Sequence, residues 1–391
     1  MGKKWVAALK SAAASLLLVM AGCWNQVDLQ DMTYISSLGI DYKDGEYRLY
    51  ANIISPAAVA KQDSSAQTDE GPSSTSRVGE AHGESVLLAI ANLSKVSQYI
   101  VSLEHLKSIV IHERALPYLS SIFDGINRQR ATRGTTWIYG TKDNMIELFQ
   151  ADLMRNVSPL DSILYSPIQV YKQDSFFEPV RMHTFLQAYK EQAMTNLMPS
   201  LSLTTKYWTE NKKKVAMPEV DGVFVFKDEQ NITYMSNEQI QGLHWMQPDF
   251  KKDFLKVSDT EGGGGKTKGV TIVIDSTKPG LSAEWHGDKP VFTIKLHAKS
   301  HVVEMEKNMT KNEIVHGAEQ KIKEEILKTY TFAKQRKADP FLLELHLYRF
   351  HNRKWKAMNR QDNWLPPADE LRVEVDVLLS SPGKYELLAH K

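Results

Sequence analysis

The first two dozen residues place the strongest constraint on where this chain can fold. The segment runs from a basic start through a short apolar stretch to small side chains: Lys3, Lys4 and Lys10, then Ser11–Met20, then Ala21-Gly22. This order is typical of a secretory signal peptide. A membrane-spanning helix needs about 20 uninterrupted apolar residues, and Lys10 leaves far fewer. We expect residues 1–22 to be removed and the rest of the chain to cross the membrane.

The cleavage point carries more information than the leader. Met20-Ala21-Gly22-Cys23 is typical of a lipobox, in which the thiol of Cys23 takes a diacylglyceryl group and becomes the mature N-terminus. Two acyl chains anchor a protein stably, at about 0.8 kcal/mol per buried CH₂, whereas one chain binds only marginally. The alternative is an ordinary signal peptide followed by a chance cysteine. Cys23 is the only cysteine in 391 residues, which favours lipidation.

The composition beyond the leader is that of a protein with a hydrophobic core. Apolar residues make up 42% of the chain and charged residues 24%, and the net charge of +1 gives no electrostatic reason to expect nucleic acid as a partner. With Cys23 lipidated, no thiol remains for disulfides, metal binding or catalysis. No second stretch is long and apolar enough to span a bilayer. We expect a tethered ectodomain with domains at 23–205 and 220–391, joined by a linker at 206–219.

Residues 23–205 predict mixed α/β packing. Two strand-like runs, Tyr34–Asp41 and Glu46–Ile54, flank Lys43-Asp44-Gly45, which is a hairpin signal. Polar residues 61–76 predict a solvated loop. The further expected elements are a helix over 78–93, a strand over 106–112, a helix over 116–128, a strand over 135–140 and helices over 144–152 and 185–194. Because strands and helices alternate, we expect some parallel strand pairing.

The predicted linker contains Lys212-Lys213-Lys214. A run of three lysines is most simply a solvated, exposed connection. Attraction to anionic lipid headgroups is the weaker alternative.

Residues 220–391 predict an α+β unit. Two capping boxes open helices, Ser236 with Gln239 and Thr310 with Glu313, and the second helix is the longest and ends near Lys337. The expected strands are 223–226, 232–235, 270–274, 291–305 and 373–379, while 341–350 is ambiguous between helix and strand. The sequence therefore predicts a curled antiparallel sheet packed against one long helix.

One glycine-rich stretch, Glu261–Thr267, resembles a phosphate-binding loop. The pattern requires a further glycine where this chain has Thr260, and no apolar strand leads into it. We interpret the stretch as a flexible loop.

Other catalytic and metal-binding patterns do not occur. The twelve histidines include no H-E-x-x-H pair and no cluster with zinc spacing; His105 and His112 are seven residues apart, and His346 and His351 are five apart, and we expect each pair to be structural or exposed. No G-x-S-x-G nucleophile motif occurs, and Glu324-Glu325 falls on the expected polar face of the long helix. We therefore expect no enzyme activity, no catalytic residue, no cofactor and no metal.

Several stretches together resemble the Ger(x)C family, the C subunit of nutrient germinant receptors of spore-forming bacteria. They are Gly22–Asn25, Leu38–Asp41, Glu80-Ala81, His105–Ile111, Asp221–Lys227, Gln241–Trp245, Gln335–Phe341 and Trp355-Lys356. The chain departs from the family pattern where Leu342-Leu343-Glu344 replaces a usual glycine and where His112 replaces another.

The resemblance implies a lipoprotein on the outer face of the spore inner membrane, anchored through Cys23. It implies assembly with a polytopic A subunit and a transporter-like B subunit, a non-enzymatic role in nutrient-triggered germination, and no direct binding of the small-molecule germinant. It also implies α/β domains around mixed sheets, two or three in number.

Two alternatives remain open from the residues alone. Two α/β-like halves behind a lipid anchor also suit a solute-binding lipoprotein that serves a transporter. A cell-wall hydrolase is the other alternative, although no acid/base pair can be nominated for it.

Overall fold

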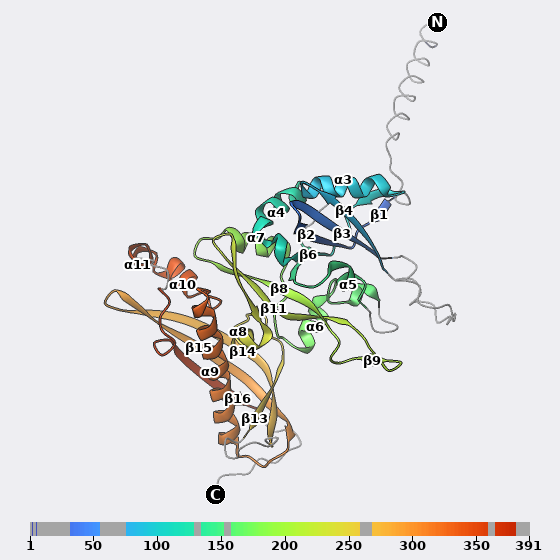
Figure 1. Ribbon diagram of the computed structural model, residues 1–391. Coiled ribbons are helices and arrows are strands. Elements are labelled where there is room, and N and C mark those ends of the chain that lie inside the picture. The colour runs from blue at the N-terminus through green and yellow to red at the C-terminus, as the bar shows by residue number, and fades with distance from the viewer. Residues whose placement is uncertain are drawn as a thin grey trace.

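The computed structural model describes residues 32–54, 76–128, 134–151, 158–258, 268–358 and 364–380, together with the single residues 2 and 5. These ranges form two main β-sheets with helices packed on them (Figure 1). No helix within the described ranges has both the length and the hydropathy needed to cross a bilayer.

The larger sheet has eight strands. In spatial order they are β12 (Gln230–Ser236), β11 (Met217–Lys227), β8 (Thr195–Thr204), β7 (Trp137–Thr141), β6 (Ser108–His112), β2 (Ser37–Lys43), β3 (Glu46–Ile54) and β4 (Ser76–Gly83). The four central strands β8, β7, β6 and β2 pair in parallel, and the flanking pairs are antiparallel. All five residues of β6 and of β7 are buried, as expected for parallel strands covered on both faces.

A tight hairpin joins β2 to β3. Its two turn residues, Asp44 and Gly45, have φ values of 58° and 84°. Positive φ at both positions is the geometry that aligns the turn with the twist of the strands, and an Asp-Gly pair adopts it readily. The predicted hairpin is therefore confirmed.

Helices cover both faces of this sheet and make a three-layer unit. One face is covered by α3 (Val86–Val96), α4 (Leu119–Asn127) and α7 (Met182–Lys190), and the 3₁₀ helix η3 (Glu113–Tyr118) leads into α4. The other face is covered by α5 (Met145–Phe149), η4 (Pro159–Asp161) and α6 (Pro167–Gln173). Alternate residues of one strand feed the two layers: in β7, Ile138 faces the first core and Tyr139 the second.

The smaller sheet has four strands and one dominant helix. In spatial order the strands are β13 (Asp253–Ser258), β14 (Gly269–His286), β15 (Lys289–Met305) and β16 (Arg372–Leu379). The first three pair antiparallel, and β16 pairs in parallel with β15. Two two-stranded ladders complete the structure: β1 (Met32–Tyr34) with β5 (Ile100–Ser102), and β9 (Thr209–Glu210) with β10 (Lys213–Lys214).

The long helix α9 (Lys311–Gln335) packs its apolar stripe on the smaller sheet (Figure 1). The stripe consists of Ile314, Ala318, Ile322, Ile326, Tyr330 and Ala333, all buried. Both predicted capping boxes are present, at Thr310 with Glu313 before α9 and at Ser236 with Gln239 before α8 (Asn237–His244). Two short helices follow α9, α10 (Leu343–Phe350) and α11 (Asn352–Ala357). The ambiguous stretch 341–350 is thus mainly helical.

Strand β11 belongs to both cores. Phe224 and Phe226 pack with the helices of the larger sheet, whereas Val223 and Val225 pack with α8, α9 and the smaller sheet. The larger sheet therefore runs across the predicted division between 23–205 and 220–391, and that division stays a prediction. Residues 206–219, the predicted linker, contain the exposed β9–β10 hairpin and the start of β11.

The fold class predicted from the sequence is confirmed: mixed sheets packed by helices, with a mainly antiparallel sheet on one long helix in the second half. The predicted helix over 78–93 is wrong in its first part, because residues 76–83 form β4. The helix begins only after Ser85, whose Oγ accepts a hydrogen bond of 3.2 Å from the N–H of Leu88. Strands β8 and β13 were not predicted. The predicted loop 61–76 lies outside the described residues, except for Ser76 at the start of β4.

Gly242 in α8 lies directly against the backbone of α9. A Cβ placed there would lie 2.3 Å from the carbonyl oxygen of Glu325 and 2.4 Å from Cα of Ile326. The N–H of Gly242 also donates to Oγ1 of Thr329 at 2.9 Å. Only a residue without a side chain permits this helix contact.

We predict that Gly242→Ala lowers the free energy of unfolding by about 1–3 kcal/mol, because the two helix backbones must separate. Helix propensity alone would change stability in the opposite direction by up to about 1 kcal/mol. The control is Gly280→Ala, where the nearest atom to a new Cβ is 3.8 Å away. Urea unfolding of the three proteins measures the effect, and an unchanged or raised stability of Gly242→Ala would contradict the close contact.

Candidate functional site

Two features singled out in the sequence, Cys23 and the glycine-rich stretch 261–267, lie outside the described residues. The structure therefore neither supports nor contradicts the lipidation of Cys23, which stays a prediction. Within the described ranges we consider three polar clusters and a cavity.

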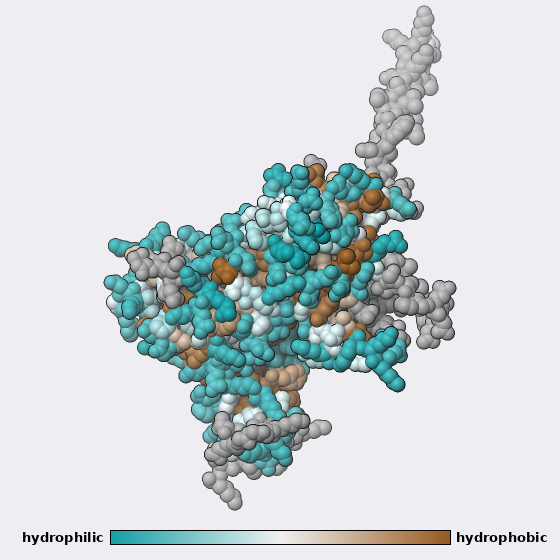
Figure 2. All heavy atoms as spheres, in the orientation of Figure 1, coloured by the Kyte–Doolittle hydropathy of each residue, from teal (hydrophilic) through white to brown (hydrophobic). Residues whose placement is uncertain are grey.

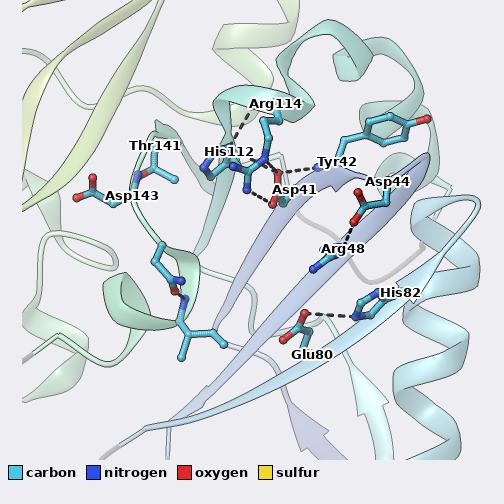
Figure 3. A network of polar contacts seen from close by, with 12 residues as sticks. Asp41, Tyr42, Asp44, Arg48, Glu80, His82, His112, Arg114, Thr141 and Asp143 are labelled. Carbon is cyan, nitrogen blue, oxygen red and sulfur yellow. Dashed lines mark hydrogen bonds and ion pairs between the residues drawn. The ribbon is translucent and has the colours of Figure 1, made fainter.

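The first cluster lies at the carboxyl ends of the parallel strands β2 and β6 (Figure 3). Asp41 accepts two hydrogen bonds from the guanidinium of Arg114, at 3.0 Å from Nε to Oδ1 and 2.5 Å from Nη2 to Oδ2. The N–H of Tyr42 also donates to Oδ1, at 2.8 Å. His112 accepts a hydrogen bond at Nδ1 from the N–H of Arg114 at 3.2 Å, and this Nδ1 lies 3.5 Å from Oδ1 of Asp41.

The charges in this cluster are set by burial and by the ion pair. Burial acts to raise the pKa of Asp41, but the hydrogen bond from Arg114 and the neighbouring His112 hold it below its ordinary value. Burial lowers the pKa of His112. At neutral pH the carboxylate is therefore charged and the imidazole is neutral. The guanidinium of Arg114 binds both oxygens of Asp41, so this cluster links β2 to the start of η3 and stabilises their contact.

The second cluster explains the stretch Gln241–Trp245. Nε2 of His244 lies 2.8 Å from Oδ2 of Asp253, and Nε1 of Trp245 donates to Oε2 of Glu325 at 2.8 Å. Burial raises the pKa of Glu325. The prediction that Glu324-Glu325 lies on a solvated helix face is therefore wrong for Glu325, which binds Trp245 across the α8–α9 contact.

The third cluster explains the stretch ending in Asp339-Pro340-Phe341. Asp339 is buried and accepts a hydrogen bond from the N–H of Glu344 at 2.8 Å, and burial raises its pKa to about 6. The buried carboxylate of Glu344 in turn binds Nζ of Lys227 at 2.6 Å and Nε1 of Trp355 at 3.3 Å. Because Lys227 ends β11, this cluster joins the larger sheet to helices α10 and α11.

The first departure from the family pattern lies beside this cluster. Leu342 has a φ of 59°, in the left-handed region that a glycine occupies without steric cost. The turn before α10 therefore keeps the glycine-like backbone although the residue is leucine. The other departure, His112, is the N-cap of η3.

A cavity lies beside the larger sheet. It has a volume of about 480 Å³ and lies between the segment 161–179 and strands β7, β8 and β11. Its wall is mainly aromatic, aliphatic and proline side chains, including Tyr139, Val170, Phe176, Pro199 and Val220. Such a volume and lining are typical of a site for a small molecule.

Hydrogen bonds to the sheet hold the irregular wall of the cavity in place. The hydroxyl of Tyr139 donates to the carbonyl of Ile163 at 2.7 Å, and Nε1 of Trp137 donates to the carbonyl of Tyr165 at 3.1 Å. The hydroxyl of Tyr171 donates to Oε1 of Gln247 at 2.9 Å, which ties α6 to the turn after α8. The cavity is therefore bounded by segments from both halves of the chain.

The charged groups of the cavity lining are all acidic. They are Asp161, Asp174 and Glu219, and neither lysine nor arginine lines the cavity. Desolvation raises the pKa of Asp174, and the nearby carboxylate of Asp253 raises it further, while His244 acts in the opposite direction. This lining favours an apolar molecule that is neutral or positively charged over an anion.

The sequence did not reveal this cavity. Its residues come from separate stretches between 139 and 237, and the one local signal is the density of proline and aromatic residues in 159–179. Neither histidine pair forms a site: His105 is exposed while His112 is buried, and the rings of His346 and His351 lie 6.1 Å apart on α10 and at its end. Across the described ranges, no three His, Cys, Asp or Glu side chains converge as metal ligands would.

We predict that Asp41→Asn lowers the free energy of unfolding by about 1.5–3 kcal/mol at pH 7, because it removes hydrogen bonds between charged groups. The pKa of Asp41 is lowered in the folded chain, so its contribution is present above the ordinary value of 3.8 and is lost as the pH falls through the folded value. The difference between wild type and variant should therefore narrow below about pH 4.

Urea unfolding at pH 7 and pH 3 measures this difference. The matched control is Asp44→Asn, which removes an exposed pair with Arg48 at 2.8 Å and should cost at most about 1 kcal/mol. A difference that stays the same at both pH values would show that the charge of Asp41 is not the cause.

Comparison with known proteins accounts for both halves of the chain. Residues 25–203 match the family described as "Spore germination protein N-terminal domain", and residues 221–383 match "Spore germination B3/ GerAC like, C-terminal". The chain is 20% identical to spore germination protein B3 of Bacillus subtilis (strain 168) over 377 residues, which is 92% of each chain. It is 21% identical to spore germination protein KC of the same strain over 378 residues, covering 89% of this chain and 88% of that relative.

A solved structure shares the fold. The crystal structure of the GerBC protein superimposes with a TM-score of 0.51 at 16% sequence identity, covering 88% of this chain and 97% of that one. The two family matches, the relatives and the shared fold agree with the stretches that the sequence alone brought together. The chain belongs to the Ger(x)C family of spore germination proteins.

Proposed function

We propose that this protein is a non-enzymatic lipoprotein subunit of a spore germinant receptor, needed for nutrient-triggered germination. In this proposal the diacylglyceryl group on Cys23 holds the body on the outer face of the spore inner membrane. There it assembles with the membrane-embedded A and B subunits of the receptor. The observation that carries the proposal is the germination-family match over residues 25–203 and 221–383, in a chain whose only cysteine follows a predicted signal peptide.

The character of the described residues supports a role in binding partners. The buried carboxylates of Asp41 and Glu344 are held in ion pairs, and that of Asp339 by a backbone N–H. None of these three carboxylates lines the cavity. Alternate residues of β15 and β16 are exposed, so the face of the smaller sheet opposite α9 remains available for contact with other subunits.

We predict that Cys23→Ala moves the protein from the membrane fraction to the soluble fraction of spores and slows nutrient-triggered germination. Loss of two acyl chains removes about 0.8 kcal/mol of membrane affinity for each buried CH₂. Fractionation, mass spectrometry of the mature N-terminus and germination rates measure the result. The control Gln26→Ala leaves residues 20–23 intact and should behave as wild type.

The partner assignment has its own measurement. A tagged copy of the wild-type protein, purified from spore membranes in mild detergent, should bring down the A and B subunits. A membrane-bound, fully active Cys23→Ala protein would contradict the anchor, and purification without either subunit would contradict the assembly.

The cavity favours a second candidate, a solute-binding lipoprotein that serves a transporter. Its volume of about 480 Å³, apolar wall and acidic lining suit a small molecule with an apolar body and a positive charge. This candidate differs from the first because it requires direct binding of a small molecule to this chain.

For this candidate we predict that phenethylamine stabilises the protein and that the matched anion 3-phenylpropionate does not. A ligand at 100 times its Kd adds about 2.7 kcal/mol to the free energy of unfolding. Val170→Trp, which fills the cavity from α6, should abolish the effect. The control Ile168→Trp on the same helix lies outside the cavity lining and should retain it. Equal stabilisation by both compounds, or none by phenethylamine and a panel of amino acids and amines, would remove this candidate.

A further inference from the structure

The β9–β10 hairpin is an exposed segment of the described chain. Every residue from 205 to 214 is exposed. The hairpin is nevertheless ordered by its own hydrogen bonds: Glu210 pairs with Lys213, Thr209 with Lys214, and the N–H of Val215 donates to the carbonyl of Trp208 at 3.1 Å. Asn211 and Lys212 form its turn, both with positive φ. The hairpin is therefore a defined projection from the sheet (Figure 1).

The composition of this projection is unusual for an exposed turn. Two large aromatic side chains lie at its base, Tyr207 at 71% exposed and Trp208 at 51% exposed. Four lysines flank these aromatic residues in the sequence: Lys206, Lys212, Lys213 and Lys214. Glu210 is the one acidic residue between 206 and 214. Figure 2 shows hydrophilic atoms where the hairpin projects from the body.

Exposed aromatic rings beside lysines match the interface of an anionic bilayer. Tyrosine and tryptophan are favoured at the headgroup level, where an apolar ring and a polar edge are both satisfied. Lysines near an anionic surface each raise affinity roughly fivefold. Hydration alone explains why the lysines are exposed. It does not explain why the large apolar ring of Trp208 is exposed next to them.

The position of the hairpin relative to the anchor determines how the body would have to lie on a membrane. The first described strand, β1, starts at Met32, nine residues after Cys23, and a chain of that length spans at most about 30 Å. An anchor at Cys23 therefore keeps the β1 end of the larger sheet close to the bilayer. β1 precedes β2 at the amino ends of the parallel strands, whereas the hairpin follows β8 at their carboxyl ends. Both reach the bilayer only if the larger sheet lies lengthwise along it. Figure 1 shows β1 beside α3 and β9 beyond α6, both on the side away from α10 and α11.

We propose that the β9–β10 hairpin, residues 206–214, is a second membrane contact. In this arrangement Tyr207 and Trp208 lie at the headgroup level and the four lysines meet the phosphates of anionic lipids. The contact would fix the orientation of a body that the N-terminal anchor alone leaves free to rotate. The proposal takes its setting from the proposed anchor at Cys23, and the test below separates the two.

The test uses the mature chain with Cys23→Ser and an N-terminal hexahistidine, held on vesicles that contain nickel-chelating lipid. This tether replaces the natural lipid, so the result does not depend on lipidation of Cys23. Because the chain then has no cysteine, Thr209→Cys places one environment-sensitive fluorophore on the hairpin. Asp288→Cys, in the exposed turn between β14 and β15, places it far from β1 as a control.

On vesicles of phosphatidylcholine with phosphatidylglycerol, we expect a blue shift at position 209 and quenching by brominated acyl chains, with neither at position 288. Without the tether, changing Lys212, Lys213 and Lys214 to Gln should lower the partition coefficient of the chain roughly a hundredfold. The control changes Lys278, Lys289 and Lys299 to Gln, which alters the net charge equally, and should leave partitioning close to wild type. Trp208→Ser should reduce the quenching.

Three outcomes would overturn the proposal. One is the absence of any shift at position 209 on anionic vesicles. Another is an equal loss from both lysine triples, which would mean that only net charge matters. The third is a shift that appears only when the A and B subunits are added, which would make the hairpin a protein interface. Failure of the natural anchor would appear separately, as an unmodified Cys23 in the mass spectrum of the native protein.

Discussion

Strand β11 is the element on which the rest of the structure depends. Its two faces are buried in different cores: Phe224 and Phe226 in the three-layer unit, Val223 and Val225 against α8 and α9. A strand shared in this way cannot shift by one residue, because every side chain would move to the wrong face. The ion pair between the partly buried Lys227 and the buried Glu344 fixes the end of the same strand to α10. The larger sheet is therefore joined to the unit built on the smaller sheet through a shared strand and an ion pair.

The sequence stretches shared with the family acquire physical roles in this arrangement. Gly242 permits the contact of α8 with α9, Trp245 binds Glu325 across it, and Asp339 caps the turn before α10. None of these residues needs a ligand to explain it. They hold α8, α9 and the turn before α10 in place within residues 220–391.

Much of the fold could be predicted from the sequence because the signals were local. The Asp44-Gly45 turn, the capping box at Thr310 and the alternation in β16 each lie within a few residues of the element they define. Strand β8 was missed because it is buried on both faces and contains Pro199, so it shows neither alternation nor a typical strand composition. The helix predicted over 78–83 was wrong because the spacing of apolar residues in a short segment can fit a strand as well as a helix. The cavity could not be predicted, since its wall forms only after distant segments meet. Cys23 is the reverse case, a site that the sequence alone indicates.

Tyr207 has a place in two features at once. It stands at the base of the β9–β10 hairpin, and it also lines the mouth of the cavity. Two binding events that share one side chain are thermodynamically linked. If the first changes the affinity of the second by some factor, the second changes the affinity of the first by the same factor. A molecule that contacts Tyr207 in the cavity would therefore change the affinity of the hairpin for a membrane. Membrane binding by the hairpin would in turn change the affinity of the cavity for that molecule by the same factor.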